Sequence, residues 1–130
     1  MTILAPIVAD SLGRWLRIPA YVVPGKAMPT DGPMSIYVAS LYRTDKEGTT
    51  NAGRPYVQAM LSIGWLGFGV APDFTGEWTG AGEAVRRLYA PDGVLLYPNP
   101  IGGQPRRNGD LLTVKVLFRA VQATQRERAA

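Results

Sequence analysis

Two apolar runs joined by a polar stretch dominate the pattern of hydrophobic and polar positions. The runs cover residues 34–42 and 56–68, and the polar residues 43–55 lie between them. In the second run apolar side chains recur at every second position, at Val57, Ala59, Leu61, Ile63 and Trp65. A spacing of two is the period of a β-strand, because alternate side chains point to opposite faces. The pattern therefore predicts a long antiparallel hairpin whose polar loop, residues 43–55, protrudes as a mobile tip.

Helical spacing precedes and follows this hairpin. Residues 3–17 place apolar side chains three and four positions apart, which predicts a helix that ends before Pro19. Residues 82–89 are predicted to form a second helix, because Val85 and Leu88 continue one apolar helical face. Short strands are predicted at residues 20–23 and 94–97.

The clearest strand after the hairpin is residues 111–121. One face is wholly apolar, and Thr113, Lys115 and Arg119 make the other face partly polar. The preceding residues 98–110 hold three prolines and an Asn-Gly pair, which predicts a long polar loop that ends in a turn.

This order of elements predicts an α+β fold. We expect a mainly antiparallel sheet, with the N-terminal helix and the second helix packed on one face and the long hairpin loop protruding. A length of 130 residues fits a single domain, which we place at residues 1–121, followed by a flexible C-terminal tail at residues 122–130.

Composition limits the chemistry that the chain can perform. The sequence has neither cysteine nor histidine, so it lacks thiolate metal ligands and the commonest general base. We therefore predict no catalytic set, no metal site and no cofactor, and expect that the protein is not an enzyme.

The tripeptide at residues 102–104 matches that of peptide-release factors, but its surroundings do not. The glycines within residues 64–69 are interpreted as a bend or bulge in a strand.

The net charge of +4 is unevenly placed. Residues 1–100 carry eight basic and eight acidic side chains, whereas residues 101–130 carry six basic and two acidic ones. This basic segment either contacts nucleic acid or an acidic protein surface, or is simply a solvated loop and tail. Arg106 and Arg107, flanked by turn residues, are the best candidates for an ionic contact. No secretory signal or membrane span is predicted, so we expect a soluble protein made in the cytoplasm, without a membrane partner.

The order of elements resembles that of the tail-terminator and head–tail joining proteins of long-tailed bacteriophages. The resemblance covers most of the chain: the helix at 3–17, the strand GPMSIYV at 32–38, the polar loop at 44–54, the strand that begins Tyr56-Val57-Gln58, the helix at 82–89 and the strand at 111–121.

The resemblance implies a structural virion protein in the neck region of the tail, made in the host cytoplasm. Such a protein would form a homo-oligomeric ring, expected to be a hexamer, that caps the tail tube and joins it to the head. The implied partners are further copies of the chain, the tail tube protein and the head–tail connector protein, with possible proximity to DNA. The residues expected to contact subunits or partners are Arg43, Lys46, Glu47, Arg54, Arg106 and Arg107.

One alternative from a different class remains open. The chain could be a small basic module that binds nucleic acid through its C-terminal arginines. An enzyme with unusual chemistry is a third interpretation, and the missing acid–base residues disfavour it.

Overall fold

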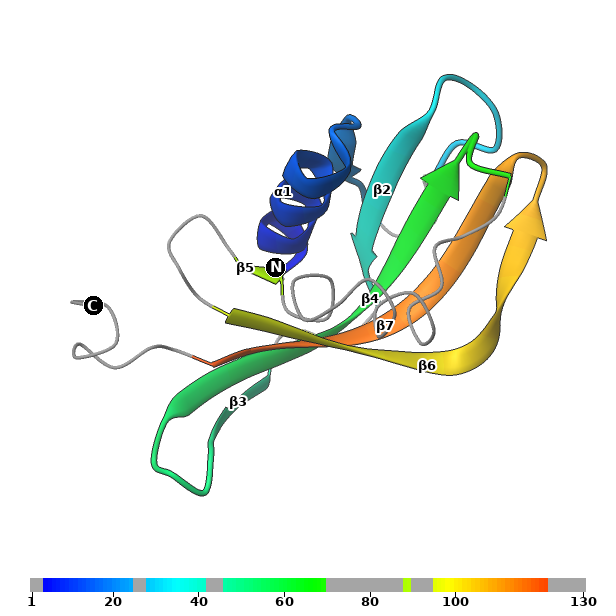
Figure 1. The fold of residues 1–130 in the computed structure, drawn as a ribbon. Helices are drawn as coiled ribbons and strands as arrows, with labels where there is room; N and C mark the ends of the chain where they lie inside the picture. Colours follow the sequence, from blue (N-terminus) through cyan, green and yellow to red (C-terminus); the bar gives the residue numbers. More distant parts are fainter. Residues whose placement is uncertain (1–3, 25–27, 42–45, 70–87, 90–94, 122–130) are drawn as a thin grey trace.

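The computed structural model describes residues 4–24, 28–41, 46–69, 88–89 and 95–121. Within these residues, one helix, α1 (Leu4–Leu16), packs on one face of a mixed, mostly antiparallel sheet (Figure 1). The α+β class, the N-terminal helix and the mainly antiparallel sheet are therefore confirmed.

Seven strands make up the sheet in this described part of the chain. The spatial order is β1-β2-β4-β7-β6-β5, and β3 pairs with β4 outside that path. Strand β1 is parallel to β2, and every other pair is antiparallel. The bounds are β1 (Ala20–Val22), β2 (Ser35–Ser40), β3 (Lys46–Thr49), β4 (Pro55–Leu66), β5 (Leu88–Tyr89), β6 (Leu95–Asn108) and β7 (Leu111–Val121).

Helix α1 is amphipathic, and its apolar side faces the sheet. Leu4, Val8 and Leu12 follow one another at a spacing of four and are at most 1% exposed. Ala5 and Ala9 are also buried, and their small side chains let the helix approach the strands closely. Burial of each large side chain contributes about 1.5–3 kcal/mol, so packing holds the helix in place more than local propensity does.

The helix ends in a left-handed residue that is not glycine. Arg17 has φ 57°, and the amide of Ile18 donates a hydrogen bond of 3.3 Å to the carbonyl of Gly13. This is the geometry of a Schellman cap, in which the left-handed position usually belongs to glycine. Pro19 follows at once and prevents the helix from continuing, as the sequence predicted.

Strand β4 is the centre of the sheet. β2 and β3 pair with successive parts of one side of it, while β7 pairs along the other side from Leu66–Leu111 to Tyr56–Val121. Trp65 is fully buried between Ile36 of β2 and Leu112 of β7, and Ile63 lies between Val38 and Val114. The predicted inner face of the hairpin is thus confirmed as the core under α1.

The protruding loop predicted at residues 43–55 is shorter in the structure. Residues 46–49 form β3, because the N-terminal half of β4 continues to Pro55 and provides a pairing partner. Residues 43–45 lie outside the described residues, and residues 50–54 form the turn between β3 and β4. The Thr50 amide donates to the Arg54 carbonyl (2.8 Å), and the Gly53 amide donates to the Thr50 carbonyl (2.9 Å). The tip is therefore a short hydrogen-bonded turn that joins two paired strands.

The polar loop predicted at residues 98–110 is wrong over most of its length. Strand β6 continues to Asn108, with Pro98 opposite Phe118 and Pro100 opposite Val116. Beyond the short pairing with β5, β6 has no further neighbour among the described residues, and an edge strand tolerates proline because its outward amide needs no partner. The polar and proline-rich composition therefore marks an edge strand.

The glycines and the turn in this region are explained by the register of β6 on β7. Pairing shifts between Ile101 and Arg106, so residues 102–105 form a bulge. The tripeptide at 102–104 lies in that bulge. The turn predicted at Asn108-Gly109 is confirmed, since Asn108 pairs with Leu111 and Gly109 has φ 61°.

Gly64 is not the predicted bend or bulge. It pairs regularly with Tyr37 on one side and Thr113 on the other. An added Cβ would lie 2.8 Å from the Met28 sulfur and 2.9 Å from a Leu111 methyl group, so the missing side chain leaves room for both neighbours.

The second helix predicted at residues 82–89 is not seen. Residues 82–87 lie outside the described residues, and Leu88 and Tyr89 belong to strand β5, opposite Leu96 and Leu95. A short apolar run fits a helix and a strand equally well, so the periodicity could not separate the two.

Replacement of Arg17 by glycine should stabilise the protein. Glycine adopts the left-handed cap without steric cost, so we expect Arg17→Gly to raise the free energy of unfolding by roughly 0.5–1 kcal/mol. Arg14→Gly, three residues earlier within α1, is the matched control and should lower it by about 1 kcal/mol. Urea denaturation measures both. An equal loss in the two variants would contradict the cap.

Candidate interaction surface

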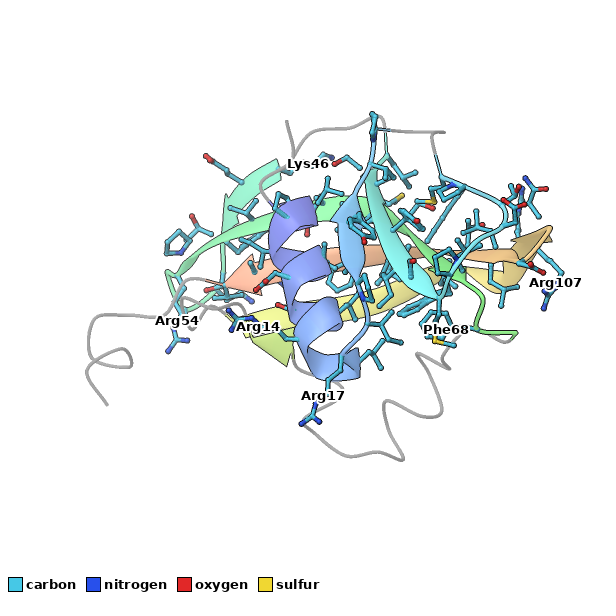
Figure 2. The ribbon with its side chains drawn as sticks, turned by 90° about the horizontal axis from the view of Figure 1, so that it is seen from above. Arg14, Arg17, Lys46, Arg54, Phe68 and Arg107 are labelled. Atoms are coloured by element: carbon cyan, nitrogen blue, oxygen red, sulfur yellow. The ribbon has the colours of Figure 1, made fainter. Side chains whose placement is uncertain are left out.

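The residues expected to contact partners fall into two separate groups. Lys46, Glu47 and Arg54 belong to the β3–β4 hairpin, near the end of the sheet where Tyr56 pairs with Val121. Arg106 and Arg107 pair with Thr113 and Leu112, near the other end of β7. Figure 2 shows Arg54 and Arg107 at opposite ends of the molecule. Arg43 lies outside the described residues. The structure therefore does not bring the six residues into one site.

The first group lies on a projection that we call the β-arm, formed by β3 and residues 55–58 of β4. Figure 1 shows the β-arm extending past the part of the sheet that α1 covers. Its turn is exposed at residues 51–53. The β-arm is held by the pairing of residues 55–58 with β3 on one side and of residues 56–58 with β7 on the other.

A stack of three residues fixes the β-arm to the sheet. The ring of Tyr56 occupies the space beside Gly48, where a Cβ would collide with it. The guanidinium of Arg119, in β7, lies over the same ring, 4.0 Å from its centroid. Tyr56 thus joins β3 to β7 through its side chain as well as through backbone pairing.

A hollow of about 430 Å³ borders the β-arm. Glu47, one of the residues expected to contact a partner, lines it. The other lining residues are Gly48, Thr49, Pro55, Tyr56 and Val57. The hollow is small and has one acidic side chain among its lining residues, so it adds a recess to the β-arm surface.

The second group has a structural role that the sequence did not reveal. Arg107 donates a hydrogen bond from Nη2 to the carbonyl of Gly69, beyond the end of β4. The neighbouring turn is tied down as well, because the Asp110 amide donates to the Thr30 carbonyl (2.9 Å) and the Gly67 amide donates to the Asp110 carbonyl (3.2 Å). Arg107 therefore helps to hold the turn, whereas Arg106 is exposed and opposite Thr113.

The face of the sheet opposite α1, which we call the open face, has a different composition. No described helix or strand packs on it, but the segment 28–34 covers one end, where Met28 lies beside Gly64 and Leu66 and Leu111 are buried on this face. Strand alternation and cross-strand register place on it Tyr21, Tyr37, Lys46, Tyr56, Gln58, Met60, Ser62, Arg106, Thr113, Lys115, Leu117 and Arg119. Of these, the sequence had indicated Lys46 and Arg106 as contact residues and the partly polar side of residues 111–121.

The described residues contain no group of three or more Asp, Glu, His or Cys side chains placed to hold a metal ion. In the same part of the chain, no helix is both long and apolar enough to cross a membrane. Compared with known protein families, curated proteins and solved structures, the chain matches none of them.

A methyl group at Gly48 should detach the β-arm from the sheet. In Gly48→Ala the new Cβ must displace the Tyr56 ring, and overpacking of this kind costs about 1–3 kcal/mol. We expect faster amide hydrogen exchange at residues 46–49. Thr49→Ala, an exposed neighbour in the same strand, is the control and should leave exchange unchanged. Unchanged protection in Gly48→Ala would show that the stack does not hold the β-arm.

Arg106 and Arg107 should differ in their effect on stability. Arg107→Ala removes the hydrogen bond to Gly69, and we expect a loss of about 1 kcal/mol in chemical denaturation. Arg106→Ala removes an exposed side chain and should change the unfolding free energy by less than about 0.5 kcal/mol. Equal effects of the two substitutions would contradict the assignment of Arg107 to the turn.

Proposed function

We propose that the chain is a structural assembly subunit that forms a ring and resembles a tail terminator or head–tail joining protein of a long-tailed bacteriophage. The observation that supports this most is the β-arm: two paired strands that project beyond the helix-covered sheet and end in an ordered, exposed turn. Because no second layer packs on it, such a projection adds little to the stability of a single subunit. It is available to contact a neighbouring subunit or partner.

The geometry of a ring suits an arm of this kind. A ring is built from heterologous contacts, in which one surface of a subunit meets a different surface of the next. The β-arm of one copy would occupy a recess or edge on its neighbour. The pairing of β4 with both β3 and β7 keeps the tip in a fixed direction, which a closed ring requires.

The two edges of the sheet differ in what they offer to a neighbour. Pro98 and Pro100 lie along β6 and remove amide donors from that edge, which protects it from strand addition. At the other edge, Tyr21 and Val22 of β1 are 50% and 48% exposed. Strand addition between subunits therefore favours the β1 edge.

In this proposal the function is assembly and not catalysis. The ring, expected to be a hexamer, would cap the tail tube and meet the head–tail connector in the neck of the virion, after synthesis in the host cytoplasm. Its partners would be further copies of the chain, the tail tube protein and the connector protein. The alternative is nucleic-acid binding through the C-terminal arginines, of which Arg106, Arg107 and Arg119 are described and Arg126 and Arg128 lie outside the described residues.

Shortening of the β-arm tip should abolish the ring but not the fold. Thr49 pairs with Pro55, so an Asn-Gly turn can replace residues 50–54 and close the same hairpin. We expect the unmodified chain to form a ring-sized species in light scattering and negative-stain microscopy. The shortened variant should keep its melting temperature within a few degrees and remain monomeric.

A pair of single substitutions gives a control that does not alter the hairpin. Ala52→Glu places a charge at an exposed position of the tip and should weaken assembly, whereas Ala52→Ser should assemble as the unmodified chain does. A monomeric unmodified chain, or a ring that forms normally without its tip, would contradict the proposed role of the β-arm.

A further inference from the structure

We infer that the open face of the sheet binds a strand of nucleic acid, with phosphates on its basic side chains and a base against its tyrosines. This inference is independent of the proposed ring. It concerns the face opposite α1 and does not require the ring, although Lys46 of the β-arm and Tyr21 of the β1 edge belong to both surfaces.

The charge of the open face has a single sign among the described residues. Lys46, Arg106 and Lys115 are exposed on it, and Arg119 is partly buried over Tyr56. The acidic strand residue Glu47 belongs to the other face, since it is opposite Val57. A face whose described strands carry several cations and no carboxylate attracts a polyanion and repels other basic surfaces.

The basic side chains follow the direction of the strands. Lys115 and Arg119 are four residues apart on β7, about 13 Å at the rise of an antiparallel strand. Arg106 is next to Thr113, and Lys46 is in the same cross-strand row as Arg119. The cations therefore span six residue steps of β7, about 20 Å, which is long enough to contact several phosphates of one strand.

Aromatic side chains accompany these cations. The rings of Tyr21 and Tyr37 stack with their centroids 5.6 Å apart, at an angle of 29°. Tyr21 is the outer ring and is half exposed, so it offers a surface on which an unpaired base can stack. Tyr37, Gly64, Thr113 and Arg106 continue the same row, which joins the aromatic pair to a cation across the sheet.

Rings combined with cations distinguish nucleic acid from an acidic protein. Aspartate and glutamate side chains would pair with the cations but leave the Tyr21 ring without a role. A single strand of nucleic acid supplies both phosphates and flat bases, and sheets that bind single strands use this combination. The open face thus fits an unpaired strand better than a duplex, whose bases are stacked internally.

Fluorescence anisotropy with a labelled oligothymidine of about twenty nucleotides tests the inference, with a duplex of equal length and poly-glutamate as competitors. We expect the single strand to bind, and to be displaced more weakly by duplex and by poly-glutamate than by unlabelled single strand. Lys46→Gln combined with Lys115→Gln should raise Kd about tenfold or more and reduce the slope of log Kd against log salt by about 1.4. Tyr21→Ala should raise Kd for the single strand about tenfold.

A charge-matched control lies near α1. Arg14→Gln with Arg17→Asn also removes two exposed positive charges, but away from the open face, and should leave Kd within about twofold. Circular dichroism confirms the fold of each variant. Absence of binding, equal losses in the two double variants, an unchanged Kd in Tyr21→Ala, or equal competition by poly-glutamate would overturn the inference. The oligomeric mass of the chain, measured separately, shows whether the ring proposal stands or fails.

Discussion

The burial of one face of β4 under α1 is the interaction on which the rest of the structure depends. Leu61, Ile63 and Trp65 are fully buried there, and each is opposite an apolar residue of β7. Because the side-chain period of a strand is two, this burial fixes the register of both neighbours, and a slip by one residue would expose the entire apolar set. The same register determines which residues reach the other face. The core therefore places the basic and aromatic side chains of the open face without contacting them.

The sequence predicted those elements of the fold whose apolar residues recur at a regular spacing. In helix α1 apolar residues recur every three or four positions, and in β4 and β7 they recur every second position. These patterns are regular enough for the buried face of each element to be assigned correctly. The two errors in the predicted loops share one cause, which is that a polar segment was taken to be a loop. Lys46–Thr49 and Pro98–Asn108 are polar or rich in proline, yet both are strands, because an edge strand with solvent beside it has no need of an apolar pattern. Edge strands are recognised from their neighbours, and a single sequence does not name the neighbours.

The candidate surfaces could be predicted less well than the fold. The sequence selected exposed charged residues, but it could not show that Arg54 and Arg107 lie at opposite ends of the sheet, since that depends on the strand order. It also gave no sign that Arg107 bonds to Gly69. The stack of Gly48, Tyr56 and Arg119 joins the β3–β4 hairpin to β7, which is far from it in the sequence. Composition and motifs describe single residues, whereas these contacts arise from cross-strand register.

The continuity of β4 has a mechanical consequence. One unbroken strand leads from the base of the exposed turn to the centre of the core, and eleven of its residues pair with β7. Antiparallel hydrogen bonds are perpendicular to the strands, so a pull on the tip along β4 shears all of these pairs together instead of opening them one after another. A load applied at the turn is therefore shared by the whole ladder. Tension on the tip along β4 is therefore resisted by all of the β4–β7 hydrogen bonds at once, and these extend into the core of the subunit.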